Sequence, residues 1–446
     1  MSTSQLVDPI TSLLPPELTT KIFQLCIQEL VQTSLEDELS TLMSFDLCHR
    51  HDNITTEGPV LLCQVSRTWR DFVYDCPMLW TNICAHTSSA LGNQHAYSEW
   101  LARSGKLPLA VCISLDLPDH IDAFTVIFNH SARIRSLRFL DTTGEDVTWD
   151  LTSSPFTSLD TFAIESVQPI KVLPMISAII ATAPHLRSIK WNLDHVPIPL
   201  HTIGSQLKEL NFSTRVSDDR TYNALRACPN VVKLLVRYRS YTEPIGGGDV
   251  LLADLQVLDS YRFAMQGVVA PKLRKFTFQG FSDYIPDLMS FIRQSPQLDD
   301  LDLNLLNAAD DLIEMIPHLS TVTRLKIAVE TVFSVLYIDK IFKTLTWHQE
   351  DGAASCLLPN LRHLYLHFNL FNVKPFDVNG EPLMNMLESR CRPYAPTAAS
   401  GGVVISRLES FTFGGDGTIT QETRQRLRSL QLQAQAPRLS LLHIDF

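Results

Sequence analysis

The chain has 446 residues, a length that suggests about three domains at roughly 150 residues each. Hydrophobic residues make up 45% of it, charged residues make up 19%, and 63 residues are leucine, so wholesale disorder, collagen-like repeats and a disulfide scaffold are excluded. The net charge of −11 argues against a broad nucleic-acid-binding surface and leaves room only for a local basic patch.

The first residues show none of the patterns of a targeting signal. Met1–Pro9 has neither the basic region nor the apolar region of a secretory signal, and no apolar run approaches the roughly 18 residues of a membrane helix. The nine cysteines contain no Cys-x-x-Cys pair. We therefore expect reduced thiols, a cytoplasmic or nuclear location, and no membrane partner.

Two helical segments are predicted within the first 85 residues. Leu14-Pro15-Pro16-Glu17-Leu18 is followed by Ile22 and Phe23, and Leu18 and Ile22 share a helical face. A later segment, 59–72, places Leu62, Val65, Trp69 and Phe72 on one predicted helical face, and it is followed by Leu79-Trp80. Between the two segments, residues 31–58 form a polar, partly acidic interruption.

In this order, Leu-Pro-x-Glu-Leu, Val-x-Arg-x-Trp-Arg and Leu-Trp resemble an F-box, of the interrupted type found in higher fungi (basidiomycete-like). The resemblance implies a helical domain over 10–85, with an insertion at about 31–58, that docks on the Skp-type adaptor of a cullin–RING (SCF) ubiquitin ligase. Carried over by position, the adaptor-binding candidates are Leu14, Pro15, Pro16, Leu18, Ile22, Phe23, Leu62, Val65, Trp69 and Trp80. For Trp69, the core of the helical domain is the stronger alternative, whereas a proline pair at a domain edge favours an interface.

From about residue 130 the chain repeats the phrase L-x-x-L-x-L, with Ile, Val or Phe as substitutes. Most successive phrases begin 18 to 27 residues apart. Their last residues alternate, as a strand with one buried face requires, and helix-like stretches lie between them. The phrases begin at Ile134, Leu159, Leu186, Leu207, Val231, Leu255, Leu273, Leu298, Val322, Leu361, Leu408 and Leu439.

This pattern resembles irregular leucine-rich repeats, and it implies an α/β solenoid over 100–446 with about twelve repeats. A parallel sheet would line the concave face and helices the convex face. Leu109–Leu115 is a candidate capping strand, and 392–402 is a candidate flexible loop. A solenoid grows by stacking repeats and can therefore be much longer than one compact domain. We expect two parts, the helical domain and the solenoid, in place of the three domains that the length suggested.

In each predicted strand, the residues that alternate with the apolar positions of the repeat face away from the core. They form a candidate surface for a protein substrate. His363, Tyr365 and His367 share one strand, and contact with a ligand or an ordinary exposed strand face are both open for them. Along the other strands the charge changes from mostly basic to acidic. The further candidates are Lys190, Arg237, Lys275, Asp300 and Asp302.

Catalytic and metal-binding patterns are weak. Cys48-His49-Arg50-His51 resembles half of a zinc site, but no second half follows at finger spacing, so a solvated loop is favoured; no catalytic motif is present. The glycine runs at 246–248 and 414–417 are predicted to be turns rather than phosphate loops. We therefore expect no cofactor, no metal and no enzyme activity. The expected function is recruitment of a protein substrate, of unknown identity, to an SCF-type ligase; the alternative is an interaction scaffold outside any ligase that uses the same two modules.

Overall fold

The fold was analysed in a computed structural model, which describes most but not all of the chain. The described ranges are 14–26, 58–85, 94–114, 121–141, 155–166, 173–193, 200–214, 219–238, 249–261, 266–306, 310–330, 335–347, 356–368, 376–378, 380–391, 405–415 and 417–433. Two compact units divide the chain, Met1–Ser213 and Thr214–Phe446. The expected insertion up to residue 57, the loop at 392–402, the glycine run at 246–248, the Cys-His pair at 48–51 and the last repeat phrase lie outside the described residues.

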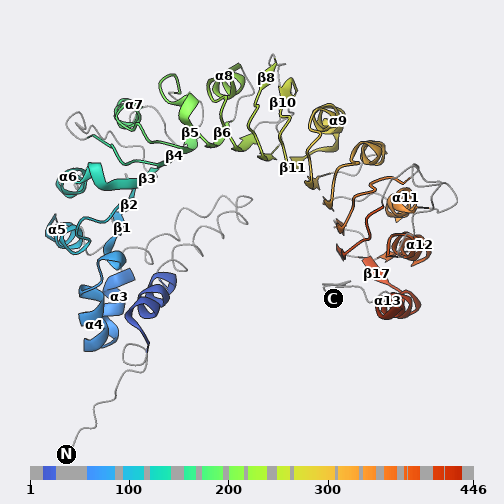
Figure 1. The fold of residues 1–446 in the computed structure, drawn as a ribbon, viewed down its shortest axis with the longest axis horizontal. Coiled ribbons are helices and arrows are strands. Elements are labelled where there is room, and N and C mark those ends of the chain that lie inside the picture. The colour runs from blue at the N-terminus through green and yellow to red at the C-terminus, as the bar shows by residue number, and fades with distance from the viewer. Residues whose placement is uncertain are drawn as a thin grey trace, which may run out of the picture. The chain divides into compact units, whose positions relative to one another are not determined.

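The first unit begins with helices and continues into strands that alternate with helices. Its helices are residues 16–26, α3 (Gly58–Val65), α4 (Arg67–Tyr74), α5 (Gln94–Arg103), α6 (Ile121–Phe128) and α7 (Leu173–Ala181), with short 3-10 turns η2 (Pro77–Trp80), η4 (Ser131–Arg133) and η5 (Gly204–Gln206). Its strands are β1 (Asn82–Ala85), β2 (Leu109–Ser114), β3 (Ile134–Asp141), β4 (Thr161–Ser166), β5 (Ser188–Leu193) and β6 (Glu209–Thr214), which pair in chain order and in parallel. Helices α5, α6 and α7 lie along one side of these strands (Figure 1).

The second unit repeats the same pattern of strand and helix. Its main strands are β7 (Lys233–Tyr238), β9 (Val257–Tyr261), β11 (Lys275–Gly280), β12 (Asp300–Leu305), β13 (Arg324–Val329), β14 (His363–Phe368) and β16 (Ser410–Gly415). Its helices are α8 (Asp219–Ala227), α9 (Ile285–Arg293), α10 (Asp310–Met315), α11 (Val335–Leu345), α12 (Gly380–Cys391) and α13 (Gln421–Gln433), with turns η6 (Ser282–Tyr284) and η7 (Ile316–His318). Two small parallel ladders, β8 (Val250–Leu251) with β10 (Val268–Val269) and β15 (Phe376–Val378) with β17 (Gly417–Ile419), complete it.

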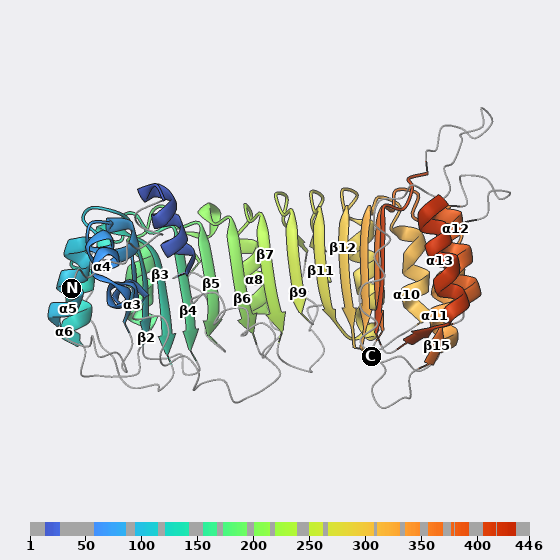
Figure 2. The ribbon, with the colours of Figure 1, turned by 90° about the horizontal axis from the view of Figure 1, so that it is seen from below.

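The fold is α/β, with a 13-stranded parallel sheet, and it is leucine-rich-repeat-like and solenoid-like. Within each unit the strands run in one direction (Figure 2). Each repeat phrase in the described residues forms one strand of the sheet, and Leu109–Ser114 forms β2 as expected. The sheet nevertheless begins earlier than predicted, because β1 starts at Asn82 rather than after residue 100.

Apolar residues that alternate along the strands build the core. In β12, Leu301, Leu303 and Leu305 are buried, while Asp302 and Asn304 between them are only half-buried. This alternation places every second side chain of a strand on the side of the helices. The opposite side, which we call the open face, therefore carries the polar members of the repeat phrase.

An aromatic cluster joins the N-terminal helices (residues 16–26, α3, α4 and η2) to helix α5 within the first unit. Trp80 is 1% exposed, donates its indole N–H to the Val73 carbonyl at 2.8 Å, and packs edge-on against Trp100 of α5 at 5.1 Å between ring centroids. The Arg103 guanidinium lies 4.8 Å from the Trp80 ring centroid and 4.5 Å from that of Tyr74. Stacking of this kind favours one arrangement of the two elements.

Candidate functional site

The first of two candidate surfaces lies on the N-terminal helices. Helix 16–26 begins directly after Pro15, whose carbonyl accepts bonds from the backbone N–H groups of Leu18 and Thr19 at 3.0 and 3.1 Å. Pro16 suits the first turn, because an amide there has no intrahelical partner. Phe23 turns inward from this helix and is 1% exposed.

The sequence predicted one helical face of apolar residues over 59–72. The structure instead has two helices there. Ser66 separates α3 from α4: its backbone is extended (φ −156°, ψ 167°), and its hydroxyl accepts a bond from the backbone N–H of Trp69 at 3.1 Å. Serine is a favoured helix N-cap because it satisfies an amide that has no intrahelical partner. The break explains why Val65 and Trp69 belong to different faces, since Val65 is 60% exposed and Trp69 is half-buried.

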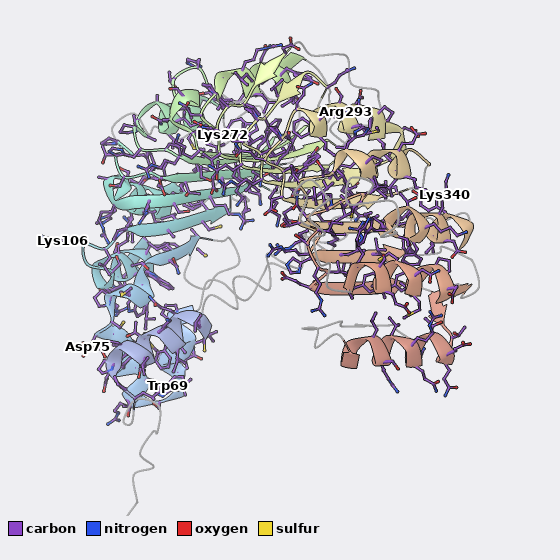
Figure 3. The ribbon with its side chains drawn as sticks, turned by 45° about the vertical axis from the view of Figure 1, so that its right-hand side comes forward. Trp69, Asp75, Lys106, Lys272, Arg293 and Lys340 are labelled. Carbon is purple, nitrogen blue, oxygen red and sulfur yellow. The ribbon has the colours of Figure 1, made fainter. Side chains whose placement is uncertain are left out.

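Three aromatic side chains form the core of these helices. Phe23 contacts Trp69 at 4.6 Å and Phe72 at 5.7 Å between ring centroids, and Figure 3 labels Trp69 on these helices. Phe23 and Trp80 were both expected to contact an adaptor, and both are buried core residues. A large ring at either position stabilises the helices from inside, and contact of these two residues with an adaptor stays a prediction. Leu14 and Leu62 are half-buried, and Pro15 and Pro16 are exposed.

Exposed apolar side chains are concentrated on the N-terminal helices. The described residues contain eight large hydrophobic side chains that are exposed, and seven of them lie between residues 18 and 78, the other being Leu251. The seven are Leu18, Ile22, Leu25, Leu61, Val65, Tyr74 and Met78. Sequence reasoning found Leu18, Ile22 and Val65 but missed the other four. For Leu25 the signal was present, because it lies three residues after Ile22 and seven after Leu18, on the same helical face.

The second candidate surface is the open face of the second unit. Register places its side chains in three rows across seven strands. The first row is Lys233, Val257, Lys275, Asp300, Arg324, His363 and Ser410; the second is Leu235, Asp259, Thr277, Asp302, Lys326, Tyr365 and Thr412; the third is Arg237, Tyr261, Gln279, Asn304, Ala328, His367 and Gly414. Seven of the eight substrate-binding candidates lie in these rows, and Lys190 lies on β5 of the first unit.

Charge on this open face alternates from strand to strand, whereas the sequence suggested a change from basic to acidic along the chain. Asp300 on β12 lies 4.0 Å from the Lys275 ammonium on β11 and 3.1 Å from the Arg324 guanidinium on β13. Asp302 binds the Lys326 ammonium at 2.9 Å. Exposed pairs of this kind contribute little to stability, at most about 1 kcal/mol each. Their main effect is to hold long side chains in one arrangement.

Two aromatic rings of β14, those of Tyr365 and His367, lie next to the ion pairs of the open face. The Lys326 ammonium lies 5.5 Å from the Tyr365 ring centroid, and Tyr365 stacks on His367 at 6.2 Å with 14° between the ring planes. The His367 ring lies over Gly414, where a Cβ atom would approach its Nδ1 atom to 2.8 Å. Gly414 is therefore part of strand β16 rather than of the predicted turn, and its lack of a side chain makes room for the ring.

Asp259 is a half-buried carboxyl group in the second row that was not among the residues predicted to bind a substrate. Burial raises the pKa of this carboxyl above its usual value, and the nearby Arg237 guanidinium opposes the rise. A perturbed carboxyl group on an accessible face is a feature of functional surfaces, although ion networks also produce it. The outward register of Asp259 follows from its place one residue after Leu258, so the repeat phrase itself contained this signal.

His363 makes polar contacts at the first row of the open face. Its Nδ1 atom lies 2.8 Å from the Ser410 hydroxyl, and its Nε2 atom lies 3.8 Å from a Glu409 carboxylate oxygen. In the described part of the chain, no three His, Cys, Asp or Glu side chains gather in a way that could hold a metal ion. No described helix is both long and apolar enough to cross a membrane.

Comparisons with known proteins were made for the whole chain. No family model matches it, and a search of curated proteins found no match. Among solved structures, the chain is similar to the leucine-rich repeat domain of APL1B, with 12% sequence identity and a TM-score of 0.29. That similarity covers 75% of this chain and 83% of the other chain.

Proposed function

We propose that this protein is a substrate-recognition adaptor of an SCF-type ubiquitin ligase. In this proposal the N-terminal helices are an F-box that docks on a Skp-type adaptor, and the repeats bind a protein substrate. The observation that carries the proposal is the concentration of exposed apolar side chains on the N-terminal helices. Contiguous exposed apolar surface typically marks a protein–protein contact.

The arrangement of these residues supports docking through one helical surface. Leu18, Ile22 and Leu25 recur at the spacing of one helical face, while Phe23 of the same helix supplies the core. An aromatic core thus supports the helix from inside and leaves its apolar outer residues for a partner. The motif order Leu-Pro-x-Glu-Leu, Val-x-Arg-x-Trp-Arg and Leu-Trp supports a Skp-type adaptor as that partner.

The open face of the second unit is our candidate for substrate recruitment. Tyrosine and arginine are enriched among residues that dominate binding energies, and this face presents Tyr261, Tyr365, Arg237 and Arg324. The ion pairs and the Tyr365–His367 stack order the side chains before a partner arrives, which lowers the entropy cost of binding.

The docking proposal is tested by calorimetric titration of the full chain with a purified Skp-type adaptor. We expect the double variant Leu18→Asp with Val65→Asp to bind roughly 100-fold more weakly, since burying two carboxylates in an apolar contact is unfavourable. Leu251→Asp is the matched control, because Leu251 is as exposed as Val65, each at 60%, and lies outside the N-terminal helices. Absence of binding by the unmodified chain, or an equal loss in the control, would refute docking.

A protein-interaction scaffold outside any ligase is the second candidate function, because the same two surfaces would serve it. Co-purification distinguishes the two functions: recovery of both adaptor and cullin supports the ligase, whereas recovery of the adaptor without cullin supports the scaffold.

Substrate recruitment is tested by proximity labelling in the presence and absence of a proteasome inhibitor. The ligase function predicts proteins that accumulate upon inhibition and that are no longer labelled with the variant Tyr365→Ala with His367→Ala. Lys340→Ala is a control for this variant, since Lys340 is exposed on helix α11 (Figure 3). Unchanged labelling by the double variant would remove the open face of the second unit from the proposal.

A further inference from the structure

Two cysteines face each other on the first two strands of the sheet. Cys84 of β1 is the register partner of Cys112 of β2, in a parallel pair. Their strand neighbours Ile83 and Val111 are buried on the side of the helices, so alternation places both thiols on the open face. Both cysteines are half-buried, and neither is in a disulfide.

The spacing of these strands is compatible with a disulfide. Neighbouring strands lie about 4.8 Å apart, and disulfides join Cα atoms about 4.4 to 6.8 Å apart. The Cβ atoms of a disulfide are closer, at about 3.8 Å, so one strand must shift slightly. β1 can do so, because it has four residues and is the terminal strand of the sheet order.

We propose that Cys84 and Cys112 form a reversible two-electron redox pair whose oxidant is a peroxide. One thiolate attacks an oxygen of the peroxide, so that an S–O bond forms and the O–O bond breaks; the sulfur becomes a sulfenic acid, and the other peroxide oxygen leaves as water or an alcohol. The second thiol then attacks the sulfenic sulfur, so that the S–S bond forms and water leaves. A thiol reductant reverses the step by exchange. Arg138 follows Cys112 in the same row on β3, and a nearby cation favours the reactive thiolate.

The Cys84–Cys112 disulfide would stabilise the segment that connects the N-terminal helices to the sheet. β1 starts two residues after Trp80, whose ring packs against Trp100. Oxidation would covalently tie β1 to β2 and so restrict movement of the segment that connects the helices to the repeats. This proposal does not depend on the proposed ligase function, because it concerns only the two strands.

Peptide mapping of the full, folded chain tests the pair. Trypsin cleaves after Arg103 and Lys106, which separates the two cysteines onto peptides 71–103 and 107–133. Because peptide 71–103 also contains Cys76, the experiment uses Cys76→Ser as the parent protein. The parent is treated with a small excess of hydrogen peroxide, and remaining thiols are alkylated before digestion without reductant.

We expect the two peptides to appear linked, lighter by two hydrogen atoms than their sum, and to separate after dithiothreitol treatment. Adding Cys84→Ser or Cys112→Ser to the parent should abolish the linked product, whereas adding Cys26→Ser, which removes an exposed thiol, should leave it unchanged. The proposal is overturned if both cysteines of the oxidised parent are alkylated, if they carry separate sulfinic or sulfonic acids, or if either is linked to a different cysteine.

Discussion

The N-terminal helices expose many of their large apolar side chains, whereas the strands of the sheet bury most of theirs. Along β12 and β14 every apolar member of the repeat phrase is buried, and the residues between them are polar or aromatic. Along helix 16–26 only Phe23 of the large apolar residues is fully buried, and Leu18 and Leu25 are about half exposed. Both segments are apolar in sequence, so composition alone does not distinguish them.

The difference indicates what each region can bind. Strand residues reach the core by alternation, so the open face of the sheet is polar and suits recognition through charges and rings. The short N-terminal helices have a small aromatic core that leaves their other apolar residues outside. An apolar helical surface suits a partner that buries it as a large, mostly dry contact.

We expect the largest loss of stability from substitution of Trp80, a buried residue of the N-terminal helices. Trp80→Ala should lower the free energy of unfolding of the first unit by about 3–5 kcal/mol, because it leaves a cavity and removes a bond to the Val73 carbonyl. Leu18→Ala, at an exposed position, should change it by less than about 0.5 kcal/mol. Chemical denaturation measures both, and equal effects would break the distinction between buried and exposed residues there.

In the second unit, we expect substitution of the buried residue Arg390 to cause a large loss of stability, as for Trp80 in the first unit. It donates hydrogen bonds to the carbonyls of Leu345, Leu357 and Leu358 and contacts the Cys356 thiol at 3.2 Å. Arg390→Met keeps much of the packing but removes all three hydrogen bonds to these carbonyls, of which the Leu358 carbonyl keeps a bond from the backbone N–H of Leu361, so we expect a loss of about 2–3 kcal/mol by denaturation. A loss below about 0.5 kcal/mol would mean that these bonds contribute nothing net.

Gly414 tests the ring array of the open face. Gly414→Ala should displace the His367 ring and cost about 1 kcal/mol of stability, because the new methyl group meets the ring. In a His367→Ala background the same substitution should be neutral or stabilising. A double-mutant cycle measures this coupling, and additive effects would contradict the contact between the two residues.

The smallest expected effect is the pH dependence caused by Asp259. Burial raises the folded-state pKa of its carboxyl above the unfolded value, so the unfolded chain releases this proton at lower pH. Stability therefore falls as pH rises from the unfolded pKa through the folded one, and the loss persists at neutral pH. Asp259→Asn should be more stable than the unmodified chain at pH 7, with the difference shrinking toward acid. A difference that grows toward acid would reverse the sign and contradict the burial argument.

Periodicity was sufficient to predict the strands of the sheet from β3 onward, because each phrase places two or three apolar residues at the spacing of a buried face. It missed β1, whose four residues come before the first phrase, and the two short ladders, which are too brief to show a period. It also missed the break at Ser66, since the residues on both sides fit one helical period. Which aromatic residues become core depends on packing between helices distant in sequence, as with Phe23 and Trp69.

Hydrogen–deuterium exchange of the full chain, with and without a Skp-type adaptor, tests the central claim most directly. Binding through the exposed apolar residues predicts slower exchange in helix 16–26 and α3 when the adaptor is present, and unchanged exchange in strands β7 to β16. Unchanged exchange in these helices at saturating adaptor, or protection confined to the strands, would contradict the account.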